Sequence, residues 1–184
     1  MRWLLSLAAA SNLSVALATV VFRGWNAAGA HAAARNTARF SSLWFMAAFA
    51  APGLSRLVRG LPAGARLVQA FVAAHLVHFA VVGALIASFE TTHLVQKPLT
   101  SATILVFGFS LVVGAGLTAT PRGSRLYSAL HTFTMYVLFL IFFLAFVQNA
   151  VRPLRLMAVP LALALLLRLT NGWTFYAARV KSPN

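Results

Sequence analysis

The sequence almost lacks acidic residues and contains no cysteine. Glu90 is the only Asp or Glu among its 184 residues, and the count of Cys is 0. The absence of cysteine excludes a disulfide scaffold, and a single carboxylate excludes an acidic dyad, a carboxylate-rich metal site and an Asp-supported triad. Charged residues make up 9% of the chain, too few to cover a water-facing surface, since soluble domains carry about 25%.

The residues that are present indicate a membrane environment. Hydrophobic residues make up 61% of the chain, and 15 Lys and Arg give a formal net charge of +14. Such hydrophobicity excludes an intrinsically disordered chain. A strongly basic chain is often a nucleic-acid binder. Here, however, the arginines stand singly between long apolar runs, so we expect a polytopic membrane protein that does not bind nucleic acid.

Six stretches meet the length of about 20 mostly apolar residues that a membrane-spanning helix needs. They cover approximately residues 3–22, 40–57, 67–89, 99–119, 126–147 and 154–176. The runs lack the period of two that barrel strands require. The sequence therefore predicts an all-α membrane protein, one domain over residues 1–184 built as a bundle of six transmembrane helices, with its longest loop at residues 23–39.

The basic residues that flank the spans indicate the orientation, because cytoplasmic loops are enriched in Lys and Arg. With the N-terminus inside, the inner side receives eight basic residues and the outer side six, and Arg168 in the last span stays unassigned. We therefore expect a cytoplasmic N-terminus. Residues 16–18 resemble a signal-peptide cleavage motif, but the apolar run continues to Arg23, which favours a retained first helix.

Three of the five histidines lie inside predicted spans. His31 and His93 fall in loops, whereas His75 and His78 lie in the third span and His131 lies in the fifth. An ionisable side chain at bilayer depth is costly and suggests a functional site. The spacing of three places His75 and His78 on one helix face. The third and fifth helices run in the same direction, and their histidines differ in depth by about 5–9 Å, so a planar cofactor fits between them.

The residue types leave several interpretations open. Haem iron takes axial imidazoles and needs neither thiols nor carboxylates, which suits this chain. Zinc needs three or four ligands, and the three membrane histidines supply three. Histidines that only form hydrogen bonds between helices are the third interpretation. Small residues on the third and fourth spans leave room for a cofactor or for close helix packing; they are Ala74, Gly83, Ala84, Gly108, Gly114 and Gly116.

Three segments carry a resemblance to a known family. They read AARNTARFSSLWFMAAFAAPGLSRLVR, RLVQAFVAAHLVHF and SRLYSALHTFTMYVLFLIFF. An arginine-rich entry to one helix, an early histidine helix and a later helix opening with Leu-His resemble the ferric reductase-like transmembrane domain family. The resemblance covers about residues 33–148. It implies b-type haem held by histidines of two helices, electron transfer, and, from the small bacterial members, a bacterial inner (plasma) membrane.

The resemblance also implies which residues hold the haem. Counting from Arg66, the ligand position of the third helix falls on His78. The Leu-His pair that ends at His131, with Tyr136 following, matches the other ligand position. His75 resembles an additional histidine of the smaller bacterial members, and is an alternative ligand or a supporting residue. Members with two haems carry further histidines along both helices, which this chain lacks at residues 86–92 and 144–145, so we expect one haem b.

Basic residues near the histidine helices are candidates for binding the haem propionates. Arg66, Arg122 and Arg125 lie on the predicted inner side and form charge-assisted hydrogen bonds there, or only set the topology. Arg168 either snorkels to the interface or lines a polar pocket. Glu90 relays a proton to a quinone, or is an exposed loop acid.

Two imidazole ligands leave the haem iron no open position, so the expected role is electron transfer. The chain has no flavin or nicotinamide domain, and the donor and acceptor are therefore separate: a quinol, a flavoprotein or a partner redox subunit. Whether the chain is itself part of an oxidoreductase stays open. The alternatives are a non-redox membrane protein, such as a small transporter or an assembly subunit, and a haem enzyme acting on a lipid-soluble substrate.

Overall fold

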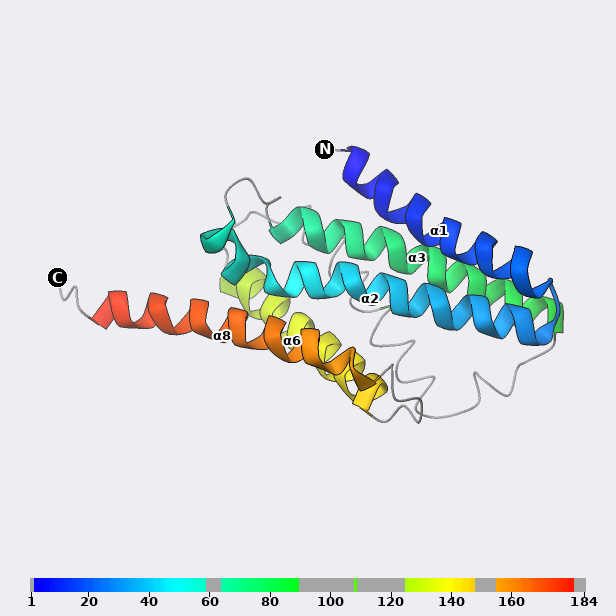
Figure 1. Cartoon of the computed structure of the whole chain (residues 1–184). Helices are drawn as coiled ribbons and strands as arrows, with labels where there is room; N and C mark the ends of the chain where they lie inside the picture. Colours follow the sequence, from blue (N-terminus) through cyan, green and yellow to red (C-terminus); the bar gives the residue numbers. More distant parts are fainter. Residues whose placement is uncertain (1, 59–63, 90–107, 109–124, 148–154, 181–184) are drawn as a thin grey trace.

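The computed structural model describes residues 2–58, 64–89, 108, 125–147 and 155–180, and the ordered elements in these ranges are five α-helices (Figure 1). The prediction of an all-helical protein is confirmed for this part of the chain, which contains no strand. The helices are α1 Arg2–Arg23, α2 Ala27–Leu57, α3 Gly64–Phe89, α6 Arg125–Val147 and α8 Ala158–Val180.

Three of these helices are long and apolar enough to cross a membrane. The apolar segments are Trp3–Arg23 of α1, Arg66–Phe89 of α3 and Ala129–Val147 of α6, and α8 contributes a shorter one, Ala158–Thr170. These segments support insertion into a lipid bilayer. The fourth predicted span, residues 99–119, lies almost wholly outside the described residues.

The predicted loop at residues 23–39 is wrong, because residues 27–39 are helical and form the first part of α2. The turn between α1 and α2 takes only three residues: Gly24, with φ +78°, ends α1, and Asn26 begins α2 by accepting a hydrogen bond from the Gly29 N–H at 2.9 Å. A residue in the left-handed region and an amide N-cap are ordinary helix-ending and helix-starting devices. The alanines that follow favour a helix, because alanine has the highest helix propensity of any residue type.

The 31-residue helix α2 is the centre of the described fold. Its length of about 46 Å exceeds the membrane's hydrocarbon thickness of about 30 Å. It contacts every other described helix, with α1 and α3 on one side and α6 and α8 on the other (Figure 1). Helices α1, α3 and α6 run in one direction and α2 and α8 in the other, so the expected parallel arrangement of the two histidine helices is confirmed.

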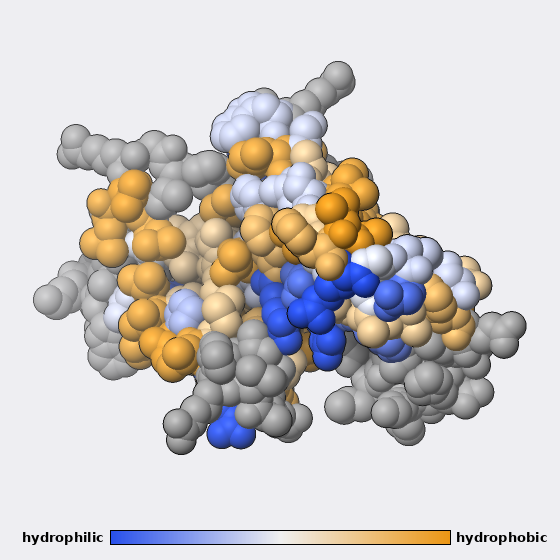
Figure 2. Space-filling view, turned by 45° about the vertical axis from the view of Figure 1, so that its right-hand side comes forward, coloured by the Kyte–Doolittle hydropathy of each residue, from blue (hydrophilic) through white to orange (hydrophobic). Residues whose placement is uncertain are grey.

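Aromatic rings join α2, α3 and α6 in the core. Phe45 of α2 lies 5.4 Å from Phe71 of α3 and 5.0 Å from Phe142 of α6, between ring centroids. Phe49, one turn along α2, stacks on Phe139 at 5.0 Å. Leucines, valines and other apolar side chains cover much of the outer surface as well, and one group of hydrophilic side chains interrupts them (Figure 2). This distribution is the one expected for a protein whose outer surface meets lipid.

Candidate histidine site

The histidines of α3 form a buried pair against α2. His75 is 3% exposed, and the centroids of the His75 and His78 rings are 4.9 Å apart. The prediction that the two lie on one face of their helix is confirmed. Two buried hydroxyl groups of α2 face them: the Thr37 Oγ1 lies 3.1 Å from the His78 Nδ1, and the Ser41 Oγ lies 2.8 Å from the His75 Nδ1.

The Thr37 hydroxyl is compatible with a proton on the Nδ1 of His78. Its Oγ1 lies 2.8 and 3.0 Å from the backbone carbonyl oxygens of Ala33 and Ala34, and 3.1 Å from the His78 Nδ1. A hydroxyl has a single hydrogen, and when that hydrogen points to one of the carbonyls the Thr37 oxygen accepts from the His78 Nδ1–H. In that arrangement the neutral ring of His78 carries its lone pair on Nε2.

Ser41 faces His75 in the same way. Its Oγ lies 2.9 Å from the carbonyl oxygen of Ala38 and 2.8 Å from the Nδ1 of His75. When the hydroxyl hydrogen points to the carbonyl, the oxygen accepts from the Nδ1–H and the Nε2 of His75 is the basic nitrogen. In histidines that bind metals, a neighbouring group usually holds the other ring nitrogen in this way.

Aromatic side chains surround this pair. The ring of His75 lies 5.4 Å from Phe71, 4.8 Å from Phe79 and 6.2 Å from Phe142, between centroids. His78 lies 5.7 Å from Phe79. Burial among apolar rings at bilayer depth disfavours a charged imidazole. The surroundings therefore favour neutral imidazoles at this site.

The third membrane histidine, His131, lies elsewhere along α6. The α6 residue that packs against His75 is Phe142, eleven residues after His131. Eleven residues correspond to about 16 Å along a helix. His131 is half-buried and within electrostatic range of Arg168 on α8. The structure therefore brings His75 and His78 together and does not bring His131 to them.

A three-histidine zinc site is not formed by the residues that the structure describes. No group of three or more His, Cys, Asp or Glu side chains able to hold a metal ion occurs among them. The separation of His131 from the α3 pair accounts for this result. Two imidazoles alone do not complete a structural or catalytic zinc site.

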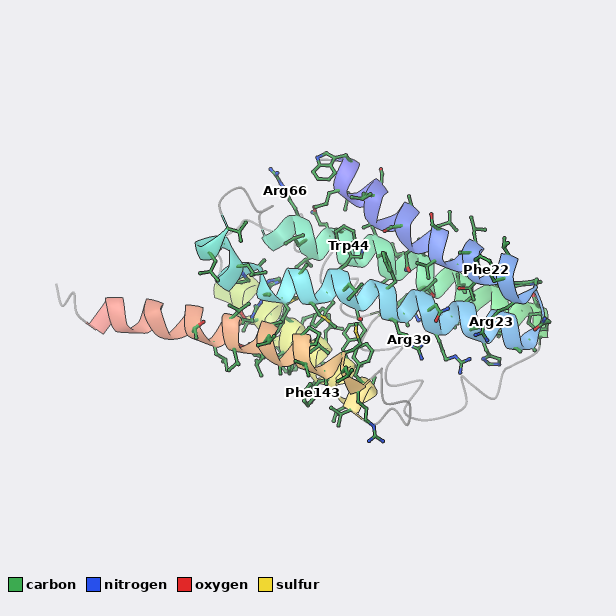
Figure 3. All side chains as sticks on the ribbon, in the orientation of Figure 1. Phe22, Arg23, Arg39, Trp44, Arg66 and Phe143 are labelled. Carbon is green, nitrogen blue, oxygen red and sulfur yellow. The ribbon has the colours of Figure 1, made fainter. Side chains whose placement is uncertain are left out.

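The arginines predicted to bind propionates are placed only in part. Arg66 is exposed at the start of α3 and projects away from α2 and α8 (Figure 3). Arg122 lies outside the described residues, and of Arg125 only the helical backbone is described. A role for these side chains in binding propionates therefore stays a prediction. Glu90 and His93 also lie outside the described residues.

Sequence reasoning missed Thr37 and Ser41. Their spacing of four residues places two hydroxyls on one helix face, which is the signal that identifies them. That signal has meaning only if the segment is helical, and the segment before Phe40 was expected to be a loop. Comparison of the chain with protein-family models, curated proteins and solved structures finds no match.

Replacing Thr37 by valine tests the role of its hydroxyl. Valine keeps the shape of threonine, so the loss is confined to the contacts of the hydroxyl, those with His78 and with the carbonyls of Ala33 and Ala34. We expect the free energy of unfolding in detergent to fall by about 1–2 kcal/mol. The matched control is Thr37→Ser, which keeps the hydroxyl. Equal stability of the valine and serine variants would show that the hydroxyl does not hold His78.

Proposed function

We propose that this chain is an integral membrane protein that binds one haem b and carries electrons between a membrane donor and a separate acceptor. The observation that supports the proposal is the α3 pair, in which α2 hydroxyls contact the Nδ1 atoms of His75 and His78, an arrangement compatible with Nε2 as the basic atom. Iron-ligating imidazoles have this tautomer and this kind of support.

The fit of the residues to a haem is complete on α3 and incomplete on α6. On α3 the donor atoms, their tautomers and the surrounding aromatic side chains suit haem iron. On α6 the residue level with His75 is Phe142, and His131 lies about 16 Å away along the helix. His131 is the second ligand that the resemblance implies, and pairing it with His78 requires α3 and α6 to shift relative to one another when haem binds.

The residues of the chain have three tasks in this proposal. Thr37 and Ser41 orient the two imidazoles of α3. Phe71, Phe79 and Phe142 exclude water from them. A bound haem supplies the one-electron redox chemistry, for which the protein offers no thiol in its sequence and a single carboxylate. The electron donor in this proposal is a quinol or a flavoprotein.

The proposal includes six membrane crossings with a cytoplasmic N-terminus. Helix α3 ends at the end of the molecule opposite to the start of α6, and residues 90–124 join the two (Figure 1). A connection between opposite ends supports one further crossing. The proposed location, the inner membrane of a bacterium, rests on the sequence resemblance and on the apolar helices.

An absorbance spectrum of the detergent-purified protein, oxidised and then reduced, tests the proposal. We expect a red preparation whose Soret band shifts on reduction. Because both axial positions are filled in the proposed state, we expect no further change with CO after reduction. A colourless protein after expression with ample haem would overturn the proposal, and a spectrum that responds to CO would favour a haem enzyme with an exchangeable ligand.

One observation favours a second candidate, a non-redox membrane protein. The hydrogen bonds from α3 to Thr37 and Ser41 join two helices at bilayer depth, and polar contacts of this kind stabilise helix packing without any cofactor. A small transporter or an assembly subunit then uses the histidines as structural residues. This candidate predicts the same absorbance for the wild type and for His78→Ala.

A further inference from the structure

Arg168 of α8 enters the junction of α2, α6 and α8. Its Nη1 donates a hydrogen bond to the carbonyl of Phe49 at 3.0 Å. Its guanidinium carbon lies 4.7 Å from the ring centroid of Phe49 and 5.5 Å from that of Tyr136. The phenol ring of Tyr136 thus lies beside the guanidinium. The side chain therefore binds within the bundle and does not extend into the surrounding lipid.

The partners of Arg168 that the structure describes are all neutral. A guanidinium is always charged and has five N–H donors, and a carbonyl and a phenol engage only part of them. A charge at membrane depth is costly unless an opposite charge compensates it. The only carboxylate of the chain, that of Glu90, is outside the described residues. His131, also within electrostatic range, adds a second basic group to the junction.

The position of Arg168 along the bundle suits an amphiphile. Phe49 lies eight residues, or about 12 Å, from the end of α2 at Leu57. Basic pockets between transmembrane helices bind anionic head groups.

We propose that Arg168, held between Phe49 and Tyr136, binds the oxyanion of a membrane amphiphile. The planar fork of a guanidinium matches phosphate and carboxylate oxygens. Two sources carry this chemistry: the phosphate of an anionic lipid, and a carboxylate of a bound haem. The site goes beyond the proposed electron transfer, because an anionic lipid binds there whether or not the protein holds haem.

The experiment compares wild-type protein with Arg168→Gln in a maltoside detergent, which carries no phosphate. The first arm titrates phosphatidylglycerol and, separately, phosphatidylcholine, and follows the thermal unfolding temperature. The second arm measures the haem content of each preparation. The matched control is Arg155→Gln, at an exposed arginine before α8. Arg168→Met, which keeps an unbranched stem and needs no hydrogen bond, supplies a folded comparison if the glutamine variant does not fold.

We expect phosphatidylglycerol to stabilise the wild type and the Arg155 variant with similar affinity, and to bind the Arg168 variants about five- to tenfold more weakly. This result, with unchanged haem content, identifies lipid phosphate as the oxyanion. Loss of haem from the Arg168 variants without a change in lipid response identifies a haem carboxylate. Arg168 variants that match the wild type in both lipid response and haem content overturn the proposal. A colourless wild type contradicts only the proposed electron transfer, because the lipid titration still tests the Arg168 site.

Discussion

Protein with His78→Ala is expected to lose its haem spectrum, and protein with His131→Ala is expected to do the same. Each substitution removes a histidine proposed to hold the haem. The His75 imidazole lies 4.9 Å from that of His78 between ring centroids, so the His75→Ala variant is measured alongside. Loss of a residue that only supports a metal ligand costs on the order of 10–100-fold in metal affinity. Loss of the ligand itself is therefore expected to leave essentially no bound haem. The measurement is the ratio of Soret to protein absorbance after purification.

His31→Ala is the matched control, because it removes an imidazole from the first turns of α2, away from the α3 pair. We expect it to retain the haem. The variant His75→Ala decides which α3 histidine ligates: retention of haem assigns the ligand to His78, and loss in His75→Ala alone assigns it to His75. If both His78→Ala and His131→Ala keep a wild-type spectrum, the proposed ligand pair is wrong.

Substitution of glycine by alanine is expected to affect stability differently at Gly53 and at Gly83. A Cβ placed on Gly53 of α2 overlaps the backbone carbonyl of Leu167 in α8 and comes within 3.0 Å of the Leu167 Cβ. A Cβ on Gly83 of α3 meets no described atom within 4 Å. Alanine is favoured over glycine inside a helix by about 1 kcal/mol. Overpacking a close helix contact costs about 1–3 kcal/mol.

We therefore expect Gly53→Ala to lower the free energy of unfolding and Gly83→Ala to leave it unchanged or raise it. Unfolding in detergent, followed by circular dichroism, measures both. The two glycines lie in helices, so the conformational preference is the same in both variants and only the neighbours differ. A Gly53→Ala protein as stable as Gly83→Ala would show that α2 and α8 do not pack in this way, and would weaken the placement of Arg168 as well.

The histidine pair shows how much of the site can be read from local spacing. A separation of three residues is sufficient to place His75 and His78 on one face, since helical geometry follows from backbone hydrogen bonds alone. Their partners are 34 and 41 residues away in the chain. Which hydroxyl meets which imidazole depends on how α2 packs against α3, and the loop expected at residues 23–39 concealed the hydroxyl of Thr37.

Composition and local periodicity were enough to predict helices that are apolar enough to span a membrane, because hydrophobicity and helix period are properties of short segments. The lack of cysteine and the single acidic residue also directed the search for a site to the histidines. The level of one helix relative to another is not such a property. An apolar helix satisfies its own backbone hydrogen bonds wherever it lies along its neighbour's axis. The sequence pattern of α6 is therefore compatible with either His131 or Phe142 beside His75. The packing of α6 against Phe45 and Phe49 of α2 selects Phe142. Packing also places Arg168 inside the bundle, whereas the sequence left open whether this side chain extends to the interface or lines a polar pocket.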